Sequence, residues 1–332
     1  MKKILAIALC LALCLPGAWV LAKVMRLVHH TDGDFVYIIL DDGTAEIRQY
    51  TGRDTSLEIP AEMKGRPVTR IGGKSFEWRF WLKEVSIPDG VEEIGDGAFR
   101  GCHSLERVSI PDSVATIGNR AFAECSSLQS IDIPENVLRL GSEAFAQCGS
   151  LTTVALPSRI TLSGANPFSG CQSLRTITVA PRHPSLATDG HILYDRQAQR
   201  LICFLQADGS DEYTVPENTQ TIGEGAFYNC TSLADIRLPE SLVQIEGHAF
   251  YGCTGLTSMQ LPDALFSIGD AAFSCCTCLQ EINLPDGLTS IGYLAFYNCR
   301  RLTSITIPAT VTSIGSDAFI GCPLVIQEND PL

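Results

Sequence analysis

The chain has 332 residues, 45% of them hydrophobic, and a formal net charge of −13. This apolar fraction is normal for a folded protein and excludes a low-complexity disordered chain. The acidic balance disfavours nucleic acid and anionic lipid as partners, because both need lysine and arginine to neutralise phosphates.

The first 22 residues have the pattern of a secretory signal peptide. Lys2 and Lys3 precede an apolar run, Ile4–Leu15, and small residues allow cleavage after Ala22. The run is shorter than the ~20 residues that span a bilayer, and leucines, not small residues, precede both of its cysteines, which argues against a lipoprotein signal. We therefore expect a secreted or cell-surface protein with no membrane span after cleavage. Its mature charge would be 22 − 37 = −15, since two lysines are removed.

Two short apolar segments after the signal predict an N-terminal cap. Phe35–Leu40 and Thr44–Tyr50 flank an Asp-Asp-Gly sequence, which is typical of a β-hairpin turn. The ends of a solenoid expose apolar core and need caps. We assign residues 23–60 to a capping hairpin and residues 323–332 to a C-terminal cap or tail.

A phenylalanine that recurs every 23 residues organises the rest of the chain. Two series of five are present: Phe76, Phe99, Phe122, Phe145, Phe168, and Phe227, Phe250, Phe273, Phe296, Phe319. Phe168, the last of the first series, and Phe227, the first of the second, are 59 residues apart, which is one step of 23 plus an insertion of 36. Such a period is typical of a solenoid, in which each repeat contacts only its neighbours. We predict repeat blocks at 61–180 and 214–322, separated by an insertion at 181–213.

One repeat, Cys102–Phe122, reads C-x-x-L-x-x-V-x-I-P-x-x-V-x-x-I-G-x-x-A-F. The alternation from Arg107 to Ile110 predicts a short half-buried strand, which Pro111 ends, and Gly118 marks a tight corner. Burying about six side chains at ~2 kcal/mol each stabilises one repeat. This gain is smaller than the loss of conformational entropy when its 23 residues become ordered. Neighbouring strands must therefore pair in parallel, and we expect a mainly β stack of about ten coils.

The insertion contains two apolar segments, Ile192–Tyr194 and Leu201–Phe204, joined by a polar turn. They predict a second hairpin. The repeat before it is degraded, because Ser163 stands at the isoleucine position and Pro167 at the alanine position. We expect a tolerated surface hairpin at a discontinuity of the array, with a hinge, a bend or a binding protrusion as alternatives.

Nine of the 14 cysteines occupy one repeat position: Cys102, Cys125, Cys148, Cys171, Cys230, Cys253, Cys276, Cys299 and Cys322. In a parallel stack their Cβ atoms would be about 4.8 Å apart, which exceeds the 3.5–4.5 Å of a disulfide. Exported proteins often form disulfides, but nine is an odd number. We predict a column of buried free thiols that pack as small apolar residues. The run Cys275–Cys278 lacks a nearby histidine and converging geometry, so we expect no metal there.

The chain shows no H-E-x-x-H sequence and no nucleophile elbow. The nearest candidate cluster is His183, Asp189, His191 and Asp195 in the insertion, which could be imagined as a metal or acid–base site. Solvated loop residues explain it better. We therefore predict a protein that is not an enzyme and has no catalytic residue, cofactor or metal.

The outward-facing residues of the predicted strands form two columns along the array, and these are the candidate ligand-binding face. One column contains Arg107, Ser130, Thr153, Thr176, Asp235, Ser258, Glu281 and Ser304. Its neighbour contains Ser109, Asp132, Ala155, Thr178, Arg237, Gln260, Asn283 and Thr306. A plain solvated sheet face is an equal alternative, because the columns lack the aromatic clusters that anchor tight protein interfaces. The columns favour weak or multivalent binding of an extracellular protein or glycan, by a monomer.

The repeated sequence closely resembles the BspA-type leucine-rich repeat family of bacterial surface and secreted proteins. The resemblance rests on I-P-x-x-V-x-x-I-G-x-x-A-F, as at Ile87–Phe99, Ile110–Phe122 and Ile307–Phe319, and it covers about residues 44–322. It implies a right-handed solenoid without long convex helices, and adhesion to host or neighbouring-cell components. It departs from the usual leucine-rich repeat, because cysteine precedes the strand and proline follows it. The alternative function is a structural spacer or presentation scaffold, with binding confined to the 181–213 insertion.

Overall fold

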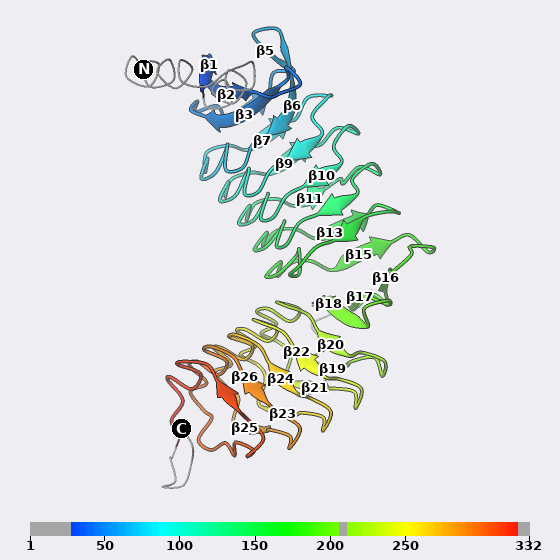
Figure 1. Ribbon diagram of the computed structural model, residues 1–332, viewed down its shortest axis with the longest axis vertical. Helices are drawn as coiled ribbons and strands as arrows, with labels where there is room; N and C mark the ends of the chain where they lie inside the picture. The colour runs from blue at the N-terminus through cyan, green and yellow to red at the C-terminus, as the bar shows by residue number, and fades with distance from the viewer. Residues whose placement is uncertain (1–27, 206–210, 325–332) are drawn as a thin grey trace, which may run out of the picture.

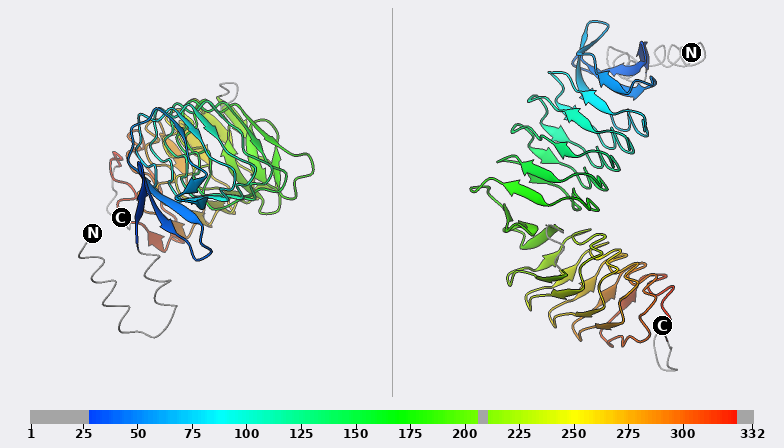
Figure 2. Two further views of the ribbon diagram at one scale, coloured as in Figure 1. Left: turned by 90° about the horizontal axis from the view of Figure 1, so that it is seen from above. Right: turned by 180° about the vertical axis from the view of Figure 1, so that it is seen from behind.

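The computed structural model describes residues 28–205 and 211–324. It is a β-solenoid of about 12 turns, and these residues contain no helix. Figure 1 shows two stacks of turns separated at the insertion, where the stack changes direction (Figure 2). The predicted β-solenoid with parallel strands is confirmed, with more turns than the ten expected. The predicted signal peptide, residues 1–22, lies outside the described residues.

A three-stranded antiparallel unit begins the structure. Strands β1 (His30–Asp32), β2 (Phe35–Ile39) and β3 (Ala45–Tyr50) pair in that order, so the predicted hairpin is present. At its turn the backbone N–H of Thr44 donates to Asp42 Oδ1 at 2.9 Å. Strand β3 then pairs in parallel with β6 (Arg66–Ile71), and this pairing joins the hairpin to the first regular turn.

Each turn of the first block, which ends at Val179, crosses two parallel sheets. The strands that precede the repeat proline are β4 (Ser56–Glu58), β7 (Glu84–Ser86), β9 (Arg107–Ser109), β11 (Ser130–Ile131), β13 (Thr153–Leu156) and β15 (Thr176–Val179). The strands that precede the repeat glycine are β6, β8 (Glu93–Ile94), β10 (Thr116–Ile117), β12 (Arg139–Leu140) and β14 (Thr161–Leu162), and β5 (Glu62–Met63) pairs with β6. Alternation predicted the first set. The second set was not predicted, because two-residue strands leave no alternation to detect.

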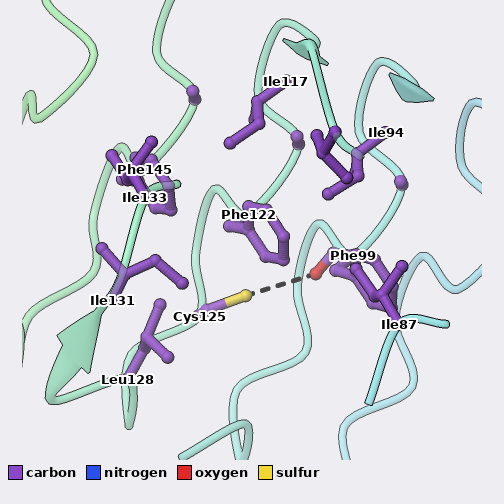
Figure 3. Close-up of a cluster of buried hydrophobic side chains, with 14 of the residues drawn as sticks. Ile87, Ile94, Phe99, Ile117, Phe122, Cys125, Leu128, Ile131, Ile133 and Phe145 are labelled. Atoms are coloured by element: carbon purple, nitrogen blue, oxygen red, sulfur yellow. Dashed lines mark hydrogen bonds between the residues drawn. The ribbon is translucent and has the colours of Figure 1, made fainter. Parts of the chain in front are cut away.

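The third side of each turn carries the phenylalanine. Its backbone pairs with the next turn without forming a regular strand: the N–H of Phe99 donates to the carbonyl of Ala121 at 2.7 Å. The rings stack face to face inside the solenoid (Figure 3), with centroids 4.8–5.9 Å apart. This phenylalanine column contains Tyr50, Phe76, Phe99, Phe122, Phe145 and Phe168, then Phe204, Phe227, Phe250, Phe273, Phe296 and Phe319. Tyr50 and Phe204 extend each series by one turn beyond the sequence prediction.

The repeat glycine is required because the turns approach each other closely. A Cβ atom on Gly141 would lie 2.4 Å from the backbone nitrogen of Asn119 and 2.5 Å from the carbonyl carbon of Gly118, both in the preceding turn. Backbone atoms in a hydrogen-bonded stack cannot move aside as a flexible side chain can. The tight corner predicted from sequence therefore reflects contact between turns.

We expect Gly141→Ala to lower the free energy of unfolding by about 3 kcal/mol, at the upper end of the overpacking range. Gly149→Ala is the matched control, because a Cβ there has nothing within 4 Å and the residue does not have a positive φ. The control should be neutral or stabilising by about 0.5 kcal/mol. Urea unfolding of both variants measures the difference, and equal midpoints would contradict the contact explanation.

The insertion forms an antiparallel sheet between the two blocks. Its strands are β16 (Leu186–Thr188), β17 (Ile192–Asp195) and β18 (Arg200–Phe204), paired in that order. Strand β18 also pairs in parallel with β20 (Thr221–Ile222). The predicted hairpin is present, but its second strand doubles as the first turn of the second block, and the parallel stack resumes there.

The two faces of this hairpin pack against different cores. Leu193 and Ile202 belong to the hydrophobic core of the first block, whereas Ile192 and Leu201 belong to that of the second. Period-two alternation produces this division, because successive strand residues point to opposite faces. The expectation of a tolerated surface hairpin is wrong: the insertion is a buried wedge, and deleting it would expose both cores.

The second block, from Phe204 onward, repeats the two-sheet turn. On the proline side lie β19 (Glu212–Thr214), β21 (Asp235–Arg237), β23 (Ser258–Gln260) and β25 (Glu281–Asn283). On the glycine side lie β20, β22 (Gln244–Ile245), β24 (Ser267–Ile268), β26 (Ser290–Ile291) and β27 (Ser313–Ile314). At the C-terminal end Leu324 packs against the second core. The rest of the predicted C-terminal cap lies outside the described residues.

The degraded repeat before the insertion has a different register from the one predicted. Leu162 pairs with Leu140 of the preceding turn, and the N–H of Ser163 donates to the carbonyl of Leu140 at 3.1 Å, as the repeat glycine does elsewhere. Leu162 therefore occupies the isoleucine position, and Ser163 does not. The chain has one residue fewer before this position and one more after it, so the Phe168 spacing hides the shift.

Candidate functional site

Most residues of the two predicted columns lie in register on the proline-side strands. Asp132 follows β11, and Ser304 and Thr306 lie in a segment that forms no strand. Ser130, Thr153 and Thr176 are paired neighbours across β11, β13 and β15, and Ser258 pairs with Glu281 across β23 and β25. Every member of both columns is exposed except Asp235, which is half-exposed. The insertion separates the columns into two stretches, so they do not form one continuous surface.

Charge in the columns is partly neutralised by neighbours. Arg107 forms an ion pair with Glu84 of the preceding turn, and Arg237 lies 4.0 Å from Asp235. Between β21 and β23 the face is hollowed into an open depression of about 370 Å³, whose lining includes Arg237, Glu240 and Gln260. Hydroxyl, amide and carboxylate groups there suit hydrogen bonding to a polar ligand.

The histidine–aspartate cluster of the insertion stabilises turns. His183 is buried, with Nε2 3.1 Å from the carbonyl of Ile160, and its Nδ1 accepts the N–H of Leu186 at 2.9 Å. Asp189 and Asp195 each accept two backbone N–H groups of the turn that follows them. The four residues therefore do not converge on one point. Within the described ranges no group of three potential ligands could hold a metal ion.

The repeat cysteines form the predicted column of free thiols. None of them forms a disulfide, and the Sγ of Cys125 donates to the carbonyl of Phe99 in the preceding turn at 3.3 Å (Figure 3). The same contact recurs along both blocks. Burial raises the pKa of Cys125 well above its usual value, and of Cys276 to about 12. Burial therefore favours the protonated thiol at Cys125 and Cys276, whereas the hydrogen bond with Cys299 lowers the pKa of the half-buried Cys322 at the end of the column.

The first regular turn departs from this pattern in a way that the repeat analysis missed. Arg79 occupies the cysteine position, and its Nε donates to the carbonyl of Tyr50 at 2.9 Å, as a column thiol does to the phenylalanine before it. The surrounding residues Glu77–Trp81, here called the aromatic loop, carry three aromatic side chains. Trp78 is 44% exposed and Phe80 59% exposed. Among the ten turns that the phenylalanine period predicts, only this one lacks the cysteine, and that was the available signal.

Guanidinium groups surround the rings of the aromatic loop. Arg100 lies over the Trp78 ring at 5.4 Å, and Arg79 and Arg53 lie 5.8 and 6.0 Å from the centre of the Trp81 ring. Exposed tryptophan beside arginine is the composition of binding hot spots. The predicted strand face lacks it, so the two candidate surfaces differ in chemistry.

Comparison with known proteins identifies the repeat. A family described as BspA type leucine rich repeat region matches residues 69–188 and 202–325. Among curated proteins no match was found. No helix in the described ranges is long and apolar enough to cross a membrane.

Several crystal structures of bacterial proteins resemble this chain. A leucine rich cell surface protein of Faecalibacterium prausnitzii is 29% identical, with 89% of this chain and 93% of that chain covered and a TM-score of 0.67. A leucine-rich repeat protein of Bacteroides ovatus is 24% identical, with 88% and 92% covered and a TM-score of 0.51. The pneumococcal vaccine antigen PcpA is 21% identical, with 91% and 89% covered and a TM-score of 0.66. The last two likenesses concern the fold. The matched residues exceed half of the chain, which therefore belongs to the BspA-type leucine-rich repeat family.

Proposed function

We propose that this protein is a secreted or cell-surface recognition protein that performs no catalysis and binds a host or neighbouring-cell protein or glycan. The observation that carries the proposal is the in-register array of short polar side chains exposed on the proline-side strands. Membership of a family whose structural relatives include a cell surface protein supports it. The signal-peptide pattern of residues 1–22 supports export.

The array favours multivalent binding of modest strength. Hydroxyl groups recur in all turns of the columns except those with Asp235 and Glu281. A ligand with its own repeat can therefore engage several turns at once, and linked weak contacts raise the overall affinity without new chemistry. Threonine and serine hydroxyls both donate and accept hydrogen bonds. The turn-stabilising roles of the insertion histidine and aspartates leave no assembled acid–base pair among them, which supports a protein without catalysis.

The test is a binding screen of residues 23–332 against immobilised matrix proteins and glycans. Thr153→Lys, Thr176→Lys and Thr178→Lys place bulk and charge on the exposed first-block columns, and together they should abolish a detected interaction. Thr161→Lys is the matched control, since Thr161 is exposed on the glycine-side strand β14. No binding to any immobilised component would contradict the proposal.

The alternative, binding through the insertion, needs a test that spares its buried strands. Gln197 and Ala198 are exposed in the β17–β18 turn, and replacing both by lysine leaves the two cores intact. Loss of binding in this variant alone would place the site on the insertion. The spacer function would then apply to the rest of the array.

A further inference from the structure

Trp78 has a backbone conformation that its side chain disfavours. Its φ is 62°, in the left-handed region, where a bulky residue is unusual and costs about 1–2 kcal/mol. The same left-handed φ recurs at the equivalent position of the other turns. Glycine occupies it at Gly101, Gly170 and Gly252, and a non-glycine side chain does so at Glu124, Gln147, Asn229, Cys275 and Asn298. The ring does not recover this cost by full burial, since it is 44% exposed. The feature peculiar to this turn is therefore its exposed aromatic side chain and not its backbone conformation.

The Trp78 ring is nevertheless held in place. It lies directly over Gly101, where an added Cβ would be 2.2 Å from the ring atom Cε3. His103 meets it edge-on at 5.7 Å, and Arg100 lies over it, fixed in turn by Glu124 at 2.9 Å. A rigid exposed ring loses little conformational entropy when a ligand covers it, and such preorganisation favours binding.

The second exposed ring is held in the same way. Phe80 packs at right angles to Trp81, with ring centroids 4.8 Å apart, and Trp81 lies beside Arg79, which the carbonyl of Tyr50 holds. Arg53 is exposed beside Trp81, and among the described residues it has no ion pair. Its N–H donors therefore remain available to a ligand.

The size of the apolar surface selects the kind of ligand. An aromatic side chain buries about 150–250 Å² when fully covered, so two half-exposed rings offer roughly 200 Å² in total. A stable protein interface buries about 800 Å² from each partner, of which about 450 Å² is apolar, about twice the area of these rings. Two stacked sugar rings need only the area present. The rim provides both donors (Arg53) and acceptors (Glu77, 3.7 Å from Arg100), which suits sugar hydroxyls.

We propose that the aromatic loop is a glycan-binding site, in which pyranose rings lay their C–H faces on Trp78 and Phe80. Arg53 and Glu77 hydrogen-bond the hydroxyl groups. This inference rests on the proposed recognition function and deepens it, because it names the glycan as ligand class and moves the anchoring contact from the strand columns to the first turn. Neutral and uronate-containing chains share the required pyranose face.

Tryptophan fluorescence tests the site directly. Trp78 and Trp81 are the only tryptophans after residue 22, so the emission of residues 23–332 reports the aromatic loop alone. We expect titration with a neutral β-glucan or with polygalacturonate to shift that emission, and the more effective probe distinguishes neutral from acidic chains. Trp78→Ala and Phe80→Ala should each weaken binding on a glycan array at least tenfold. Phe266→Ala, which removes a 47% exposed ring in the second block, should leave binding unchanged.

Two further variants separate the position of the ring from its presence. Gly101→Ala displaces the Trp78 ring while keeping every aromatic residue, and it should lose binding, whereas Trp78→Tyr should keep most of it. The inference is overturned if neither polysaccharide changes the emission and the array shows no binding, or if the loop binds only a protein. It also fails if glycan binding survives Trp78→Ala with Phe80→Ala but is lost in the strand-face lysine variants. The proposed recognition function would survive that last result.

Discussion

The free energy of unfolding of this protein should fall steeply as the pH rises above 9. Burial raises the pKa of Cys102, Cys203 and Cys276 to about 12 in the folded chain, against the ordinary thiol pKa of 9.0 in the unfolded chain. The folded state therefore retains protons that the unfolded state releases. The stabilisation is complete below pH 9 and is lost as the pH rises from 9 towards 12. Each such thiol contributes about 1.4 kcal/mol per pH unit across that window.

Urea unfolding under reducing conditions at pH 8, 9 and 10 measures this effect. Tyrosines contribute at the top of this range, because their ordinary pKa is 10.0 and burial raises the pKa of Tyr50, Tyr213 and Tyr251 in the folded chain. Comparison with a cysteine variant at the same pH values is therefore what isolates the thiols. Cys253→Ala is the matched variant, because it removes one buried thiol whose pKa is also raised by burial. Its free energy of unfolding should fall less steeply with pH than that of the parent protein, by the contribution of one proton. A stability that does not change between pH 8 and pH 10 would contradict the buried protonated column.

Removing one ring from the phenylalanine column should destabilise the first block by about 3–5 kcal/mol, the range for a buried phenylalanine replaced by alanine. Phe122 is fully buried and stacks on Phe99 at 5.2 Å and on Phe145 at 5.4 Å. Phe122→Ala therefore loses two stacking contacts and leaves a cavity. Because each turn is stabilised by its neighbours, we expect the variant to unfold in two steps.

Phe319→Ala is the control for position in the stack. Phe319 is only half-buried and stacks on one ring, Phe296, at 5.4 Å, so its loss should cost clearly less than that of Phe122. Circular dichroism during urea unfolding measures both variants. Equal losses, or a single transition unchanged in Phe122→Ala, would mean that the column does not couple neighbouring turns.

The two candidate surfaces lead to different expectations for binding. The strand columns carry polar side chains at every turn, so a defect at one turn should weaken binding only in part. The aromatic loop occurs once, so its loss should remove the anchoring contact entirely. Comparing the affinity of the strand-face lysine variants with that of Trp78→Ala therefore measures how much each surface contributes to binding.

The 23-residue period predicted most of the fold because it records a contact that every turn makes. Phe122 recurs because its ring must stack, Gly118 because the turns nearly touch, and Cys125 because a small donor fits beside Phe99. Where the chain breaks the period, prediction weakened. Leu162 took the place expected for Ser163, since a deletion and an insertion cancel before Phe168.

The candidate site shows the same division. The columns on β9 to β25 were placed correctly on exposed strands, because alternation assigns each residue a face. The aromatic loop was missed because its contacts join residues far apart in the sequence. Arg53 lies beside Trp81 and Arg100 lies over Trp78, and neither separation follows a sequence pattern. Only the stacking of turns brings Arg100 over Trp78, 22 residues earlier in the chain.

The sequence by itself determined the repeat, the mainly β solenoid, the free thiols and the two polar columns. Each of these follows from one interaction repeated at a constant spacing, and a period makes such an interaction visible. The tertiary structure alone decided that the insertion is a wedge shared by two cores, and that rings and guanidinium groups of different turns meet at Trp78. Both depend on contacts made only once, between residues whose separation leaves no pattern in the chain.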